Sequence, residues 1–252
     1  MSDSAPDLSR QHPAMTWVRF PRANALFVFA ISLLATKIFA LILAEYRFYF
    51  PANFEATFLL GRENSFHGVY AVAFYTHLIV APLTLLLALF LVSTGLRSMA
   101  TRRRGHRLAG RVQAGLVIGF LVPSGLVMAT QALAGPIAGV GFMCLSLATG
   151  LSVTATAVTA IRCQLKLHRR WAIRSAILLA SPLLLRFLAG AAFMLQVDSP
   201  EFYRVNAWVS WLLPLAAYQV FCVFVSETPH RWRRFLNPFA ESRSRDESLQ
   251  VD

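Results

Sequence analysis

Three ionisable residues lie inside long apolar stretches of this sequence, namely Lys37, His77 and Arg186. A charged side chain near the centre of a bilayer costs about 2.5–3.5 kcal/mol on insertion scales, so each such residue is a candidate for function. If the stretches are membrane-crossing helices, a rise of about 1.5 Å per residue puts all three at a similar depth in the outer leaflet. No acidic residue occupies that layer. The set predicts a polar cavity that binds a small anionic or amphipathic molecule, or water.

A structural role would also explain the two cations. The ammonium of Lys37 can extend to the outer surface of the membrane. The guanidinium of Arg186 can bond backbone carbonyls that a kink at Pro182 sets free. Both interpretations stay open at this point.

Two further histidines, His106 and His168, stand at the basic ends of two apolar stretches. Neutral imidazoles that face each other across a helix bundle are what a six-coordinate b-type haem requires, so these residues are candidate haem ligands. No apolar stretch offers a second histidine to pair with His77. Because both candidates lie among arginines, binding of lipid head groups is the alternative interpretation.

A His-Arg dipeptide occurs three times at equal intervals. The copies are His106-Arg107, His168-Arg169 and His230-Arg231, each 62 residues after the one before. The interval is about the length of one helical hairpin, so a duplicated hairpin would explain it. No other match was recognised at this period, which favours coincidence between similarly built basic loops.

Six apolar stretches must position these residues. Hydrophobic residues make up 56% of the chain and charged residues only 14%, too few charges to cover a soluble domain of this size. Each stretch is continuously apolar over roughly the 20 residues that cross a bilayer, without the alternation of a barrel strand. The expected fold is all-α, a polytopic membrane helix bundle with six transmembrane helices. They cover residues 24–44, 69–92, 112–133, 142–161, 175–196 and 205–225.

The net charge of +12 arises from arginines and lysines that gather in alternate connections between the stretches. Enrichment of basic residues on the cytoplasmic side predicts both termini inside, in the inner membrane of a bacterium. Since topology accounts for the charge, a nucleic-acid partner is not expected. Residues 1–23 are predicted to be a polar cytoplasmic tail, and 226–252 a basic and then disordered one. Residues 45–68 form the largest external segment, whose aromatic residues suit a membrane interface.

Glycines predict where the helices approach one another. Gly115 and Gly119 form a small-xxx-small step, which allows a neighbouring backbone to come close. The third predicted span is therefore expected at the packed centre of the bundle.

Signatures of catalysis and metal binding are missing. The sequence shows neither a P-loop nor H-E-x-x-H nor a recognisable catalytic triad. Its three cysteines form no C-x-x-C pair, so they indicate neither a metal site nor a disulfide framework. No catalytic residue is assigned.

Two motifs resemble a known family. The segment 104–111 reads Arg-Gly-His-Arg-Leu-Ala-Gly-Arg, and 168–175 reads His-Arg-Arg-Trp-Ala-Ile-Arg-Ser, with Leu185-Arg186 following. Over roughly Phe66 to Gly190 the chain resembles the bacterial predicted-membrane-protein family catalogued as domain of unknown function 2306. It departs from that pattern at Ala172, where Met is usual, and lacks a Gly-x-x-Gln element near the end of the second span. The resemblance implies a multispan bundle and supplies no established activity.

Three hypotheses about function follow. The first is binding or transport of a small anionic or amphipathic molecule at Lys37, His77 and Arg186. The second is a membrane redox protein with a b-type haem at His106 and His168, or with a quinone. The third is a scaffold subunit. Membrane lipids are expected partners in all three.

Overall fold

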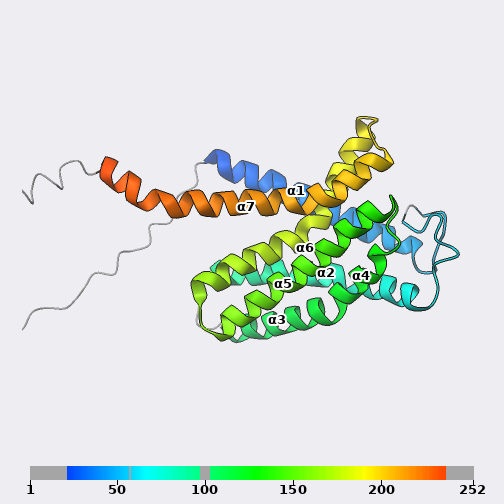
Figure 1. The fold of residues 1–252 in the computed structure, drawn as a ribbon, viewed down its shortest axis with the longest axis horizontal. Coiled ribbons are helices and arrows are strands. Elements are labelled where there is room, and N and C mark those ends of the chain that lie inside the picture. The colour runs from blue at the N-terminus through cyan, green and yellow to red at the C-terminus, as the bar shows by residue number, and fades with distance from the viewer. Residues whose placement is uncertain (1–21, 57, 97–102, 237–252) are drawn as a thin grey trace, which may run out of the picture. The chain divides into compact units, whose positions relative to one another are not determined.

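The structure, a computed structural model, describes residues 22–56, 58–96 and 103–236. Every long element in these ranges is a helix, and six helices are long and apolar enough to cross a membrane. The predicted all-α bundle with six membrane helices is confirmed, whereas its orientation with both termini inside stays a prediction. The elements are α1 (Arg22–Glu45), η1 (Tyr46–Phe48), α2 (Gly68–Leu96), α3 (Arg103–Leu116), η3 (Val117–Leu121), α4 (Val122–Ala129), α5 (Pro136–Ile161), α6 (Leu165–Met194) and α7 (Pro200–Leu236), shown in Figure 1.

The chain divides into two compact units, residues 1–46 and 47–252. The first contains α1, whose side chains are largely exposed and apolar, as expected for a helix that faces lipid. Residues 1–21 of the predicted polar tail at 1–23 lie outside the described residues, and the last two residues of that tail begin α1. The predicted tail at 226–252 begins as a continuation of α7, and residues 237–252 lie outside the described part.

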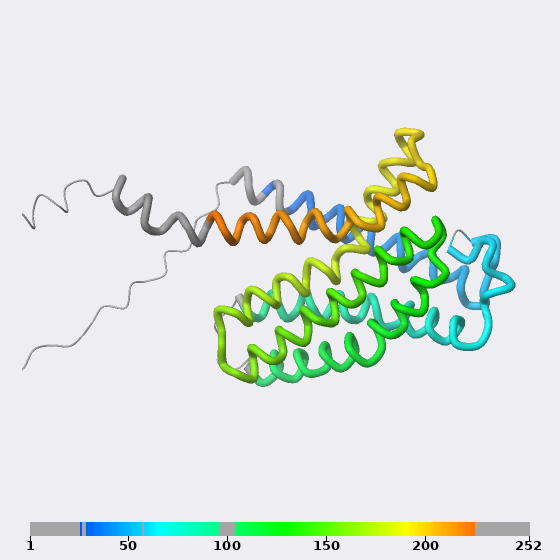
Figure 2. Tube along the Cα trace, in the orientation of Figure 1, coloured from blue at the N-terminus to red at the C-terminus, as the bar shows by residue number. Residues whose placement is uncertain are grey.

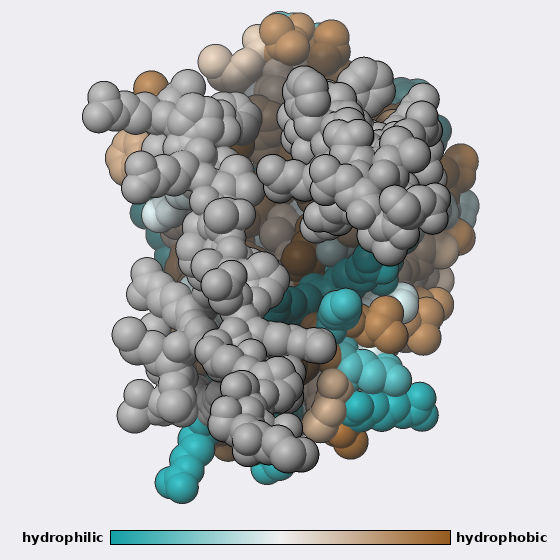
Figure 3. Space-filling view, turned by 90° about the vertical axis from the view of Figure 1, so that its left-hand side faces the viewer, coloured by the Kyte–Doolittle hydropathy of each residue, from teal (hydrophilic) through white to brown (hydrophobic). Residues whose placement is uncertain are grey.

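The second unit is a bundle in which consecutive helices run back and forth (Figure 2). Helices α3, η3 and α4 form one continuous span, α2 packs against it, and α5, α6 and α7 complete the unit. The end of α2, the start of α3, the end of α5 and the start of α6 form what we call the arginine-rich end. Segment 47–67, the α4–α5 turn and the start of α7 form the aromatic end. Figure 3 shows hydrophilic side chains projecting from the arginine-rich end.

Several helices begin earlier than the predicted apolar stretches inside them, and α3 and α6 do so by the largest margin. Helix α3 begins at Arg103 and α6 at Leu165, before the predicted spans at 112 and 175. Backbone hydrogen bonding does not require apolar side chains, and Arg, Lys, Leu and Ala are good helix formers. His106 and His168 therefore both lie in the first turn of a helix, where their positions are fixed by the backbone.

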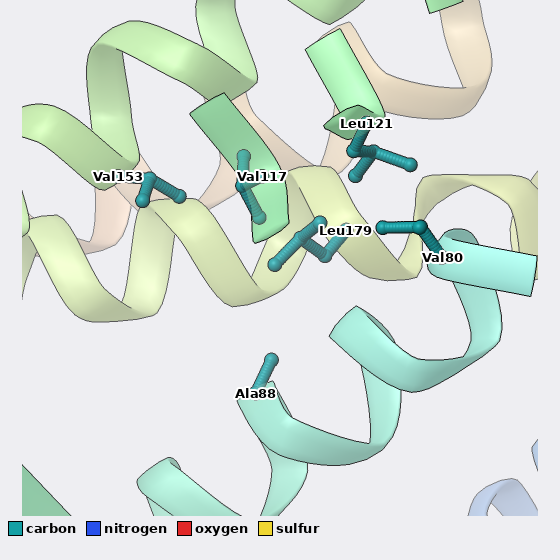
Figure 4. Packing of buried hydrophobic residues seen from close by; sticks show 6 residues of the cluster. All are labelled: Val80, Ala88, Val117, Leu121, Val153 and Leu179. Atoms are coloured by element: carbon teal, nitrogen blue, oxygen red, sulfur yellow. The ribbon is translucent and has the colours of Figure 1, made fainter. Parts of the chain in front are cut away.

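The core of the bundle lies where α2, η3, α5 and α6 meet. Six buried residues pack together there, namely Val80, Ala88, Val117, Leu121, Val153 and Leu179 (Figure 4). Glycines bring the backbones close at other points: a Cβ on Gly139 would lie 2.7 Å from the carbonyl oxygen of Ala129. At Gly115 and Gly119 no described side chain and no backbone of another helix lies within 4 Å of such a Cβ, so the predicted close approach is wrong within this chain.

The segment between α1 and α2 folds back onto the start of α2. Tyr49 and Leu59 are buried, and the rings of Phe58 and Phe66 contact that of Phe74. The aromatic residues of this segment therefore pack against one another.

Candidate functional site

The arginine-rich end brings together two of the predicted site residues. His106 on α3 and His168 on α6 are both partly exposed, and their ring centroids lie 6.4 Å apart with ring planes at 77°. The residues are distant in sequence and come from different helical hairpins. Their meeting at one point is the arrangement that the haem hypothesis requires.

The contact of His106 with Thr94 indicates which ring nitrogen carries its proton. Nδ1 lies 2.9 Å from Oγ1 of Thr94, and that hydroxyl lies 2.8 Å from the carbonyl oxygen of Phe90. A hydroxyl has one proton to donate and a carbonyl can only accept, so both contacts are hydrogen bonds at once only when the Thr94 proton goes to Phe90. Nδ1 of His106 is then the donor to Thr94. In the neutral ring Nε2 is left with a lone pair.

For His168, a backbone carbonyl indicates that Nδ1 carries the proton. Its Nδ1 lies 3.0 Å from the carbonyl oxygen of Thr156, which can only accept a proton. Nδ1 of His168 is therefore also protonated, and Nε2 carries the lone pair. Histidines that bind metals typically donate the other ring N–H to such an acceptor, which fixes the tautomer and orients the ring.

The two hairpins that supply these histidines share the same residue spacing. Thr94 precedes His106 by 12 residues and Thr156 precedes His168 by 12. The buried core positions Val117 and Leu179 are 62 residues apart, like the histidines. The interpretation of the interval as coincidence stays a prediction, because Thr156 contacts His168 through a backbone carbonyl, which any residue supplies. The side chain of His230 lies outside the described residues.

The 6.4 Å between the two ring centroids is close to the separation of two imidazoles bound to one metal from opposite sides. With metal–nitrogen distances of about 2 Å on both sides, two axial imidazoles have centroids roughly 6 Å apart. No group of three or more His, Cys, Asp or Glu side chains that could hold a bare ion occurs among the described residues. The other positions around a metal would have to come from the cofactor itself, and a tetrapyrrole supplies four. The residues present thus fit a haem better than a protein-bound ion.

The charge around the pair is entirely positive. Segments 103–111 and 162–174 contain no acidic residue. Six exposed arginines lie in them: Arg104, Arg107, Arg111, Arg162, Arg169 and Arg170. Arg174 is engaged elsewhere, because its guanidinium donates to Oε1 of Gln219 at 2.7 Å and lies over the ring of Trp171. The exposed arginines suit carboxylates or phosphates, such as the propionates of a haem or lipid head groups.

His77 lies elsewhere, within the bundle between α2 and α4. Its Nδ1 is 3.2 Å from Oγ of Ser124, whose own proton goes to the carbonyl oxygen of Phe120 at 2.7 Å. Ser124 lies in the first turn of α4, just after the π-helical turn η3, and a Cβ on Gly125 would lie 3.5 Å from Cε1 of His77. Turns of this kind often mark functional positions. No other histidine meets His77 among the described residues.

Arg186 and Lys37 have other surroundings. Arg186 is partly buried on α6, within electrostatic range of Tyr203 on α7. Lys37 is exposed on α1 and belongs to the separate first unit. A cavity shared by Lys37, His77 and Arg186 therefore stays a prediction.

Residues 74–222 match the family described as "Predicted membrane protein (DUF2306)". The chain belongs to this family. Its matched region contains both paired histidines, both supporting threonines, His77 and Arg186. No curated protein and no solved structure matches the chain. The DUF2306 assignment thus agrees with the resemblance and adds no activity.

Sequence reasoning missed two groups of residues. Thr94 and Thr156 could have been found from their common spacing to the histidines. Arg62 and Tyr70 at the aromatic end are buried, although Arg62 lies in a polar connection that looks exposed in the sequence. Only the folded structure shows their burial.

Proposed function

We propose that this DUF2306 protein is a membrane haem protein in which His106 and His168 are the axial ligands of one b-type haem. One observation supports the proposal: the two imidazoles meet, and each has its Nδ1 within hydrogen-bond distance of an oxygen, which leaves Nε2 as the nitrogen for a metal. Two hairpins of similar design each supply one ligand and one threonine. This arrangement suits a planar cofactor that needs one ligand on each of its two faces.

A six-coordinate haem of this kind carries single electrons, so the proposed activity is membrane electron transfer. Thr94 and the Thr156 carbonyl hold the imidazoles in the ligating tautomer. The exposed arginines at the same end would pair with the propionate carboxylates of the haem. We place this end at the cytoplasmic face of a bacterial inner membrane, because the basic residues gather there.

Visible spectroscopy tests the proposal. The full chain, purified in mild detergent from haem-replete cells, is expected to show the sharp reduced bands of bis-imidazole haem. His106→Ala and His168→Ala should each abolish them. His77→Ala, which removes an imidazole outside the pair, is the matched control and should keep the spectrum. A folded but colourless protein, or one whose spectrum survives both substitutions in the pair, would exclude this function.

The other hypotheses keep the status of predictions. Binding or transport at Lys37, His77 and Arg186 is supported by the cost of placing cations in a membrane. A quinone partner and a scaffold role rest on the sequence alone.

A further inference from the structure

A second cluster of polar side chains lies at the aromatic end, whereas the histidine pair lies at the arginine-rich end. The centre of the cluster is Arg62, which is only 7% exposed. The guanidinium donates through Nε and Nη2 to the carbonyl oxygen of Gln131, at 3.3 and 2.8 Å, and through Nη1 to that of Phe58. A guanidinium has five N–H groups, so two remain without a bond to the described residues. No carboxylate of the described residues forms an ion pair with it.

A neighbouring hydroxyl also lacks a partner. Tyr70 at the start of α2 is 8% exposed, and its hydroxyl is buried without a hydrogen bond in the described structure. Buried polar groups are almost always paired, with protein, water or a ligand. Aromatic contacts hold this tyrosine near Arg62: the guanidinium lies over Phe58, Phe58 stacks on Phe74, and Phe66 contacts both Phe74 and Tyr70.

A second phenol, that of Tyr203, comes near from α7. Tyr203 is within electrostatic range of both Arg62 and Tyr70. Its ring contacts Phe142 on α5 with centroids 6.1 Å apart. The segment before α2, the start of α2 and the start of α7 therefore bring Arg62 and two phenols together beside aromatic rings. Arg186 on α6 is also within electrostatic range of Tyr203.

A nearby arginine shows what a purely structural role looks like. Arg204 donates to the carbonyl oxygen of Ala134 at 2.9 Å, so it also clamps the α4–α5 turn. However, Arg204 has a carboxylate partner, Glu201, at 3.5 Å, and its side chain is 40% exposed. An arginine can thus bind the α4–α5 turn while it is partly exposed and paired with a carboxylate. Arg62 has that extra property, and it needs a different explanation.

We propose that Arg62, Tyr70 and Tyr203 form a binding site for an oxyanion group attached to a hydrocarbon chain. The unpaired guanidinium N–H groups and the Tyr70 hydroxyl are donors that an oxyanion accepts. The rings of Phe58, Phe66 and Phe74 form an apolar wall beside them. The chain would extend along the apolar helix surfaces into the bilayer. A fatty acid and an anionic phospholipid share this chemistry, and both are available in a membrane. The site is independent of the proposed haem.

Binding measurements on the full chain test this site. Native mass spectrometry of the detergent-purified protein, titrated with oleate, phosphatidylglycerol or oleyl alcohol, separates the sources. Binding of oleate identifies a fatty acid, and binding of phosphatidylglycerol alone identifies a phospholipid. Oleyl alcohol has the same chain without the charge and is expected not to bind. Equal binding of oleyl alcohol, or binding of none of the three probes, would overturn the proposal.

Tyr70→Phe is the decisive variant, because it removes only the hydroxyl and leaves the aromatic packing. We expect it to weaken binding of the charged probe about tenfold, the usual effect of one hydrogen bond to a charged group. The matched control is Tyr75→Phe, since that hydroxyl already donates to the carbonyl oxygen of Tyr49 at 3.1 Å. Unchanged affinity in Tyr70→Phe, or an equal loss in both variants, would contradict the proposed site. The haem spectrum of Tyr70→Phe should stay unaltered, so this test can fail or succeed independently of the haem test.

Discussion

The two ends of the bundle offer opposite chemistry to a ligand. At the arginine-rich end, His106 and His168 use their N–H groups within the protein and leave lone pairs free. At the aromatic end, Arg62 and Tyr70 keep unpaired N–H and O–H groups. Lone pairs bind a metal, whereas donors bind an anion. The same helices can thus carry two sites of different kinds, because each site depends on which polar atoms the fold has already satisfied.

The difference leads to a test in which each end is disabled in turn. His106→Ala should remove all haem while oleate binding stays within about twofold, a difference of only about 0.4 kcal/mol. Tyr70→Phe should keep the full haem content and lose about tenfold in oleate affinity. Absorbance and native mass spectra of the same preparations give both readouts. Loss of both properties in either variant would show that the ends are coupled or that the protein has unfolded.

The orientation of the two ends across the membrane gives the next test, in which each reporter signal is either present or absent. If basic residues mark the cytoplasmic face, reporter fusions after Gly61 and after Arg103 should report opposite sides, the first outside and the second inside. Alkaline phosphatase and green fluorescent protein fusions measure this directly. Signals from the same side at both points would refute the six-helix topology with both termini inside.

The sequence predicted the helices well because the membrane imposes a strong pattern. A run of about 20 apolar residues can be recognised without any knowledge of its neighbours. The pair of histidines was also predictable, since both lie beside the same kind of basic segment. The burial of Arg62 was not, because it depends on a segment folding back onto α2 and on a carbonyl 69 residues away.

Helix packing was the least predictable feature. The step at Gly115 and Gly119 matches the usual pattern for close approach, yet no described side chain and no backbone of another helix lies within 4 Å of a Cβ placed there. Gly139 instead meets the backbone at the end of α4, through a turn that brings two helices into contact. Which face of a helix meets a neighbour depends on rotation about its axis, and small residues alone do not determine it.

These glycines allow a matched comparison of stability. Gly139→Ala should lower the free energy of unfolding by about 1–3 kcal/mol, because the new Cβ would be 2.7 Å from a backbone oxygen that cannot move aside freely. Gly115→Ala adds the same methyl group where there is space, and the better helix propensity of Ala should leave stability equal or up to about 1 kcal/mol higher. Thermal unfolding in one detergent measures both. A Gly139→Ala protein as stable as Gly115→Ala would contradict the close contact of α4 and α5.

The two threonines provide the finest test, because they do the same task with different atoms. Thr94 holds His106 through its side-chain hydroxyl, so Thr94→Val removes the acceptor while keeping the shape. Thr156 holds His168 through its backbone carbonyl, which Thr156→Val retains. Loss of the partner that orients a ligating histidine typically costs 10–100-fold in metal affinity. We therefore expect haem binding at least about tenfold weaker in Thr94→Val and a smaller change in Thr156→Val.

Haem titration of the apoproteins, followed by absorbance, gives these affinities. Thr156 supplies its own control for side-chain packing, since its hydroxyl lies 3.1 Å from that of Ser175 and donates to the carbonyl oxygen of Ser152. If packing rather than tautomer control decided haem affinity, both substitutions would weaken it equally. If neither threonine mattered, the tautomers would not be set by these bonds, and the equivalence of the two hairpins would have no consequence for the ligand. Only the unequal result agrees with two imidazoles held by their Nδ1 protons.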